Sequence, residues 1–96
     1  AADPAHLHAM CADYRAGATV DKALDEADLA AGRKIAAPLH FLWASAGFPA
    51  QTGDPARLWR AWASQVTDQS CSAGHFAMEE TPQEVIAAFG PFFAGR

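Results

Sequence analysis

One histidine lies in a setting that could support catalysis. His75 follows Gly74 in the stretch CSAGHFAMEETPQEV, which continues with two acids and the start of a helix. A neutral imidazole can accept a proton from water near neutral pH when a carboxylate holds its other ring nitrogen. From the residues alone, a packed structural histidine ahead of a helix is the more economical interpretation, so the elements around His75 must decide.

The other chemically capable side chains have simpler explanations. His6 and His8 raise the question of a metal site, but side chains two positions apart on a helix point to different faces, and no third ligand is near. We therefore expect a solvated pair, no metal and no cofactor. His40 lies in an apolar run, where we expect it to be hydrogen-bonded rather than reactive. Glu79 and Glu80 precede a helix start, and the favourable helix dipole is enough to explain them.

Length and charge exclude several function classes. The chain has 96 residues, a formal net charge of −4 and 51% apolar residues, many of them alanines, which predicts one small domain with a modest core. Its few basic residues are scattered, so neither nucleic acid nor an anionic membrane is a predicted partner. No apolar run approaches the roughly 20 residues that span a bilayer, and the first ten residues lack signal-peptide features. We expect a soluble, cytoplasmic protein.

The two cysteines give no disulfide framework. Cys11 and Cys71 are far apart in the sequence and have no second pair, which also excludes the usual zinc spacings. We expect both to be buried free thiols.

The first third of the chain is typical of two helices. Asp3 can cap the first, Pro4 suits its first turn, and the apolar residues that follow recur at helical spacing before Gly17 stops it. The predicted inward face consists of Leu7, Met10, Cys11 and Tyr14. Thr19 is predicted to cap a second helix that ends at Gly32.

A strand is predicted next. Residues 39–44 form a nearly continuous apolar run between Pro38 and Gly47, a pattern typical of a strand covered on both faces in a parallel sheet. A short helix follows, with Asp54 as its predicted cap, and residues 64–71 suggest a second, more polar strand. Strand, helix and strand in this order form the crossover unit of a parallel sheet.

The last helix has the clearest start signal. Thr81 is the predicted cap, Pro82 lies in the first turn, and Glu84 would complete a capping box. We expect Val85, Ile86, Phe89 and Phe93 to face inward, and Gly90 with Pro91 to kink or end the helix.

Two parallel strands make an incomplete sheet. If residues 39–44 had no further neighbour, an apolar strand would expose an unpaired backbone edge. The pattern therefore indicates the end of something larger.

Several motifs resemble a known family. The order of elements looks like the C-terminal third of α/β-hydrolases, where a catalytic histidine lies in the loop before the last helix. More narrowly, MCADYRAG, DEADLAAGRKIAAP, FLWASAGF and GHFAMEETP resemble the fluoroacetate and haloacetate dehalogenases. The likeness spans almost the whole chain, and CADYRAG and AGHF.MEETP are its most specific parts.

The resemblance implies roles for two residues. In that family an aspartate displaces halide from the substrate's α-carbon and forms an ester, which histidine-activated water then hydrolyses. On this resemblance His75 is the general base, and Tyr14 falls on the tyrosine of the DYR motif, which binds halide. For Tyr14, packing on a helix beside Met10 and Cys11 is an equally good explanation.

Other parts of the family's site are missing from this sequence. No G-x-D-x-G-like nucleophile motif is present, and the arginines, histidine and tryptophan that bind substrate and halide belong to the region upstream. Asp54 is better explained as a helix cap than as the acid partner of the histidine, and in the dehalogenases that acid comes earlier in the chain.

We therefore expect an α/β fold that is the C-terminal fragment of an α/β-hydrolase, comprising the end of the helical cap plus the last two parallel strands and their helices. Residues 1–32 would be the end of the cap with connecting helices, and residues 33–96 the C-terminal part of the core. The predicted substrate is a small halogenated carboxylic acid, and the fragment alone is expected to be inactive. Predicted partners are the rest of the hydrolase chain or a second copy in a homodimer.

Two alternatives remain. The first is an epoxide hydrolase or other α/β-hydrolase that also forms a covalent intermediate with the enzyme. The second is a non-catalytic remnant that acts as a binding or assembly module through its open sheet edge.

Overall fold

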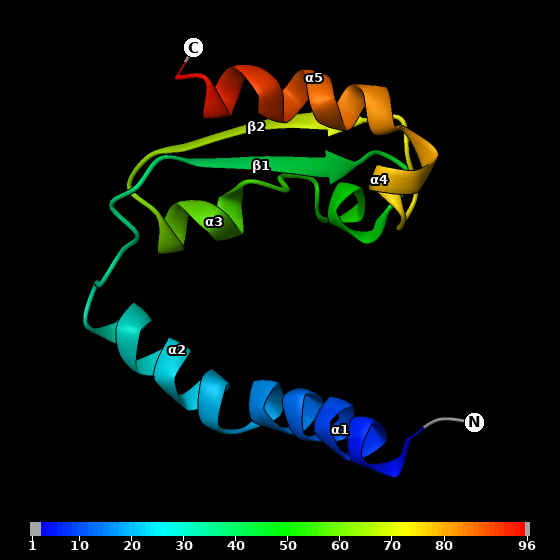
Figure 1. Ribbon diagram of the computed structural model, residues 1–96. Helices are drawn as coiled ribbons and strands as arrows, with labels where there is room; N and C mark the ends of the chain where they lie inside the picture. The colour runs from blue at the N-terminus through cyan, green and yellow to red at the C-terminus, as the bar shows by residue number, and fades with distance from the viewer. Residues whose placement is uncertain (1–2, 96) are drawn as a thin grey trace. The chain divides into compact units, whose positions relative to one another are not determined.

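The computed structural model describes residues 3–95 and divides the chain into two compact units, Ala1–Arg33 and Lys34–Arg96. The first contains only helices, and the second contains two strands with their helices (Figure 1). This is a mixed helix and strand structure with a parallel strand pair, compatible with the predicted α/β fold. What each unit contributes to a larger protein stays a prediction.

The first unit consists of α1 (Pro4–Ala18) and α2 (Val20–Ala30). The predicted cap of α1 is confirmed, because Asp3 Oδ1 accepts a hydrogen bond from the Ala5 N–H at 2.9 Å. Gly17 does not stop α1, and the Thr19 hydroxyl donates back to the Arg15 carbonyl at 2.7 Å instead of capping α2. Hydroxyls near a helix end often prefer such a bond to a carbonyl four residues earlier.

The predicted inward face of α1 is not covered within this unit. Leu7, Met10 and Cys11 are exposed, and Tyr14 is 82% exposed. The prediction that Cys11 is buried is therefore wrong, because helical spacing gives a face but not the surface that covers it.

The second unit is built on two parallel strands. β1 (Leu39–Ala44) pairs with β2 (Val66–Cys71), with Leu39 opposite Val66 and Ala44 opposite Cys71. Both strand predictions are confirmed, including the weaker one. The connection runs through a 3₁₀ helix, η1 (Phe48–Thr52), and α3 (Arg57–Trp62).

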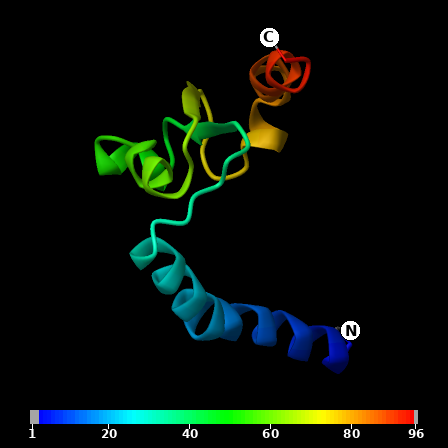
Figure 2. The ribbon, with the colours of Figure 1, turned by 90° about the vertical axis from the view of Figure 1, so that its left-hand side faces the viewer.

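Helices lie on both faces of the strand pair. α5 (Pro82–Phe93) lies along one face, and η1 and α3 lie along the other (Figures 1 and 2). Successive residues of a strand point to opposite faces, and β1 shows this directly. The His40 ring stacks on Phe92 of α5, while the next ring, Phe41, contacts Trp59 of α3.

Two cap predictions in this unit are wrong, and of the prediction that Gly90 and Pro91 kink or end the last helix, only the ending is contradicted. Asp54 pairs with Arg60 through its side chain, at 3.0 Å, and does not cap α3. α5 continues through Pro91 to Phe93 rather than ending there. The predicted capping box does not form, because the Thr81 hydroxyl donates to the Ala77 carbonyl.

The inward residues of α5 also differ from the prediction. Val85 and Phe89 are half-buried as expected, whereas Ile86 and Phe93 are exposed. Phe92 takes the inward position against β1. The inward position thus moves from Phe93 to Phe92, a change that a small rotation of the helix about its axis is enough to produce.

The buried core consists of small side chains. The buried apolar residues are Ala56, Ala63, Cys71, Ala73 and Ala88, and among residues 3–95 no large side chain is fully buried. Cys71 is a buried free thiol, as predicted. In the part of the chain that the structure describes, no helix is both long and apolar enough to cross a membrane.

Candidate functional site: the histidine loop after the second strand

The loop that carries His75 joins the end of β2 to a single helical turn, α4 (Ala77–Glu80). Ala73 is buried within it, while His75 and Phe76 are exposed. The two rings meet edge to face, with centroids 5.0 Å apart. His75 is thus an exposed loop side chain, and its packed structural interpretation is not supported.

Two glutamates hold the backbone of this loop. Glu80 Oε1 accepts a hydrogen bond from the Gly74 N–H at 3.0 Å, and its Oε2 accepts one from the Phe76 N–H at 2.9 Å. Glu84 Oε2 accepts a bond from the Ser72 N–H at 2.8 Å. Amides bound to a charged carboxylate form stronger hydrogen bonds than amides bound to neutral acceptors.

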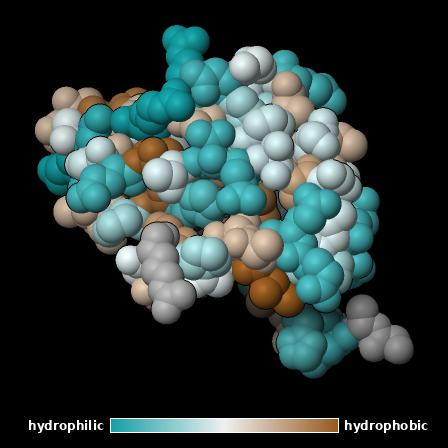
Figure 3. Space-filling model, turned by 90° about the horizontal axis from the view of Figure 1, so that it is seen from above, coloured by the Kyte–Doolittle hydropathy of each residue, from teal (hydrophilic) through white to brown (hydrophobic). Residues whose placement is uncertain are grey.

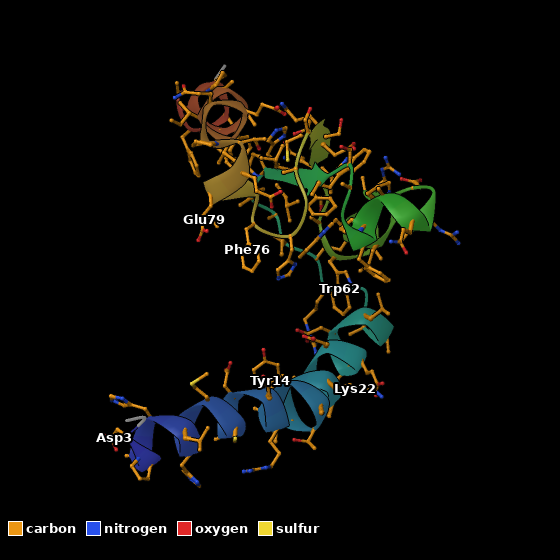
Figure 4. The ribbon with its side chains drawn as sticks, turned by 90° about the vertical axis from the view of Figure 1, so that its right-hand side faces the viewer. Asp3, Tyr14, Lys22, Trp62, Phe76 and Glu79 are labelled. Atoms are coloured by element: carbon orange, nitrogen blue, oxygen red, sulfur yellow. The ribbon has the colours of Figure 1, made fainter. Side chains whose placement is uncertain are left out.

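The explanation of Glu79 and Glu80 by helix dipole alone is therefore incomplete. Glu80 is the last residue of α4 and its carboxylate binds back to the loop, whereas Glu79, also exposed, has no side-chain hydrogen bond among the described residues. The side chains of Glu79 and Phe76 both point outward from this unit (Figure 4). Glu84 of α5 uses its carboxylate for Ser72 rather than for the capping box.

Gly74 allows the close approach of Glu80. A Cβ atom at this position would lie 3.3 Å from Glu80 Oε1 and 3.4 Å from Oε2, a contact tighter than most. Because Gly74 has no side chain, the Glu80 carboxylate has room to bind the backbone on both sides of His75.

No carboxylate orients the His75 ring within residues 3–95. Both oxygens of Glu80, the carboxylate bound to this loop on either side of His75, accept hydrogen bonds from amides. The ion pairs of the described residues join Lys22 to Glu26, Arg33 to Asp28 and Arg60 to Asp54, and none includes His75.

The other histidines have structural positions. His40 Nδ1 forms a 2.7 Å hydrogen bond with Thr67 Oγ1, which confirms the expected role, and its Nε2 is buried without a hydrogen-bond partner among the described residues. His6 and His8 are both exposed on α1. Within residues 3–95, no group of three potential ligand side chains could hold a metal ion.

Tyr14 and His75 belong to different units. Tyr14 lies on α1 of the first unit (Figure 4), and His75 lies in the second. Their meeting in one site stays a prediction.

The sequence is similar to that of a known hydrolase. It is 32% identical over 92 residues to a fluoroacetate dehalogenase of a Burkholderia species. The relationship is a distant one. The match covers 96% of this chain but only 30% of that enzyme, and no family model matches the chain.

Sequence reasoning missed both glutamates that hold the loop. A signal was present, since a glycine before the histidine and a glutamate five residues after it are compatible with a backbone clamp. That signal is weak, because it does not say where the carboxylate points.

Proposed function

We propose that this chain forms the C-terminal part of a haloacetate dehalogenase-type α/β-hydrolase and supplies its water-activating histidine, His75. The substrate would be a small halogenated carboxylic acid such as a haloacetate. The proposal extends to Tyr14 as a halide contact, brought to the site from the first unit. The rest of the hydrolase chain, or a second copy, would be the partner.

The observation that carries the proposal is the similarity to fluoroacetate dehalogenase along nearly the whole chain. Two structural features support it. His75 is exposed in a loop at the carboxyl end of a parallel strand, the edge where α/β folds bind ligands, and the amides of that loop are held by carboxylates.

The proposed chemistry has two covalent steps. An aspartate outside this chain attacks the α-carbon of the substrate, and halide leaves with the bonding electron pair. Water then adds to the carbonyl carbon of the ester while its proton passes to the His75 imidazole. The ester bond breaks, and the departing alkoxide takes the remaining proton of the added water, which releases a hydroxy acid and regenerates the aspartate as a carboxylate. The imidazolium of His75 then gives its proton to solvent.

Tyr14 would act in the first step. A phenolic O–H can donate a hydrogen bond to the departing halide, and this donation stabilises the transition state because negative charge is growing on that atom. The arrangement would need the two units, and a nucleophile from outside the chain, to meet around the substrate.

A chimera tests the role of His75. In the Burkholderia enzyme, the matched segment is replaced by the 92 matching residues of this chain, and the chimera is assayed for fluoride release. With His75→Ala we expect one fluoride per active site and no turnover, because the ester forms but is not hydrolysed. Intact mass spectrometry should then detect the trapped ester.

The matched control is His8→Ala, which removes another exposed histidine and should leave turnover unchanged. Continued multiple turnover by the His75→Ala chimera would refute the proposal. The 96-residue chain by itself should release no halide above its own His75→Ala variant.

A second candidate is a non-catalytic assembly module, and one observation favours it. Large apolar side chains are exposed in the second unit, including Phe48 at 76% and Phe93 at 81%. Figure 3 shows hydrophobic atoms at several places on an otherwise largely hydrophilic face. Such surface is typical of a chain that associates with another.

A further inference from the structure

The backbone of the loop between β2 and α4 is held by side-chain carboxylates. Its backbone N–H groups at Ser72, Gly74 and Phe76 all donate to carboxylate oxygens, from Glu84 in the first case and from Glu80 in the other two. Alternate amides of one short segment are thus fixed by two acids from the helices that follow it.

Glu80 makes the more informative pair of contacts. Its two oxygens accept hydrogen bonds from the N–H groups of Gly74 and Phe76, the residues directly before and after His75, at 3.0 Å and 2.9 Å. The Glu80 N–H also donates to the Phe76 carbonyl at 2.9 Å. Glu80 is therefore hydrogen-bonded to the backbone on both sides of His75.

The chemistry of the contacts indicates positioning rather than proton transfer. Both oxygens of Glu80 bind backbone amides, no hydrogen bond joins Glu80 to the His75 ring among the described residues, and the His75 side chain is exposed. Among residues 3–95, Glu80 forms no ion pair that would draw it away from the loop.

We infer that Glu80 is the positioning residue of His75. It binds the N–H groups of Gly74 and Phe76, the residues on either side of the histidine, and so presents the imidazole at one place on the loop, and Glu84 anchors the start of the same loop to α5. This inference rests on the proposed catalytic role of His75 and adds the residue on which that role would depend.

Nuclear magnetic resonance of the 96-residue chain tests the clamp directly. In Glu80→Gln the side chain keeps one acceptor oxygen and places an NH₂ group against the second amide. We expect the backbone order parameter at His75 to fall from about 0.85 to below about 0.6. Hydrogen exchange at Gly74 and Phe76 should become roughly 10- to 100-fold faster, the effect of losing one hydrogen bond to a charged group.

Glu79→Gln is the matched control, since it makes the same charge change one residue away on an exposed side chain. It should change neither quantity. Unchanged chemical shifts across β1 and β2 would show that the fold persists in both variants. An unaltered loop in Glu80→Gln would overturn the inference.

Gly74→Ala provides a second variant if Glu80→Gln unfolds. It keeps every carboxylate and pushes a methyl group to 3.3 Å from Glu80 Oε1, and we expect the same loss of order, confined to the loop, to a smaller degree. A fully ordered His75 amide in this variant would count against the clamp.

The chimera separates this inference from the proposed function. Glu80→Gln should leave the first fluoride burst intact and lower the turnover rate about tenfold or more, because only the water-activating step depends on where His75 lies. A loosened loop with unchanged turnover would overturn the positioning role. Normal turnover with His75→Ala would instead refute the proposed function and leave the loop measurements standing.

Discussion

At the scale of single residues, hydrogen bonding distinguishes the histidines better than sequence position does. His40 and His75 both lie on or next to the strand pair, yet His40 is bonded to Thr67 and packed against α5, while His75 is exposed in a loop. His40 is half-buried, hydrogen-bonded and beside two aromatic rings, so its role is structural. An exposed imidazole on an ordered backbone remains free for chemistry.

The bond between His40 and Thr67 should contribute to stability. Thr67→Val keeps the shape of the side chain but removes the hydroxyl, which leaves His40 Nδ1 without its partner. We expect the free energy of unfolding to fall by about 1–2 kcal/mol, measured by urea denaturation followed by circular dichroism. Ser70→Ala, an exposed hydroxyl on the same strand, should cost much less, and an equal loss in both variants would contradict this account.

The hydroxyl of Tyr14 is predicted to act on the first chemical step. In the chimera, Tyr14→Phe should slow fluoride release by roughly 10²-fold, since one hydrogen-bond donor to the developing negative charge is lost. Rapid-quench measurement of the first turnover reports that step alone. A first turnover as fast as that of the unsubstituted chimera would indicate that Tyr14 serves packing only.

At the scale of elements, local signals placed the strands and helices well but described their ends poorly. The apolar run of residues 39–44 predicted β1 correctly because a strand covered on both faces must be apolar on both. The predicted side-chain caps at Thr19, Asp54 and Thr81 do not form, because each side chain binds a different group. A cap residue offers one polar group, and the tertiary structure decides which neighbour receives it.

Pro91 offers a test at this scale. Because α5 continues past it to Phe93, the Ala87 carbonyl has no N–H from residue 91 to accept. Pro91→Ala restores that donor at an exposed position, and we expect the free energy of unfolding to rise by about 1–2 kcal/mol after the greater freedom of the unfolded chain is subtracted.

Thermal or urea denaturation measures this change, and Pro82→Ala is its matched control. Pro82 lies in the first turn of α5, where no helical N–H is needed, so its replacement should bring no such gain. A loss of stability in Pro91→Ala would mean that the proline ring contributes more by packing than the hydrogen bond does.

At the scale of the whole molecule, the amount of exposed apolar surface is the main physical fact. The buried residues are small, and large apolar side chains are exposed in each unit by itself. Burial of large side chains is the main source of stability in small proteins. A chain of this kind would gain stability if a partner covered that apolar surface.

We therefore expect the isolated chain to self-associate. Sedimentation equilibrium should show an average mass above that of the monomer, rising with protein concentration. Replacing Phe48 and Leu58, which are 76% and 68% exposed, by serine should shift the distribution toward monomer if their face is the one that associates. A stable monomer at all concentrations would count strongly against the assembly-module alternative.

The sequence by itself determined the two strands, the four longer helices and their order, whereas η1 and α4 were not predicted. Apolar runs, helical spacing and the first cap are local properties, and a parallel strand pair with a crossover helix follows from them. The resemblance of the GHF motif also singled out His75 before any geometry was known. These features could be predicted because each depends on residues that are neighbours in the chain.

Only the tertiary structure decided which polar groups meet. Glu80 and Glu84 bind the amides around His75, and His40 pairs with Thr67 across the strands. A carboxylate can satisfy any donor within reach, and its reach is set by how the helices pack on the sheet. The physical reason is that hydrogen-bond partners are chosen by distance in space, which local sequence patterns do not contain.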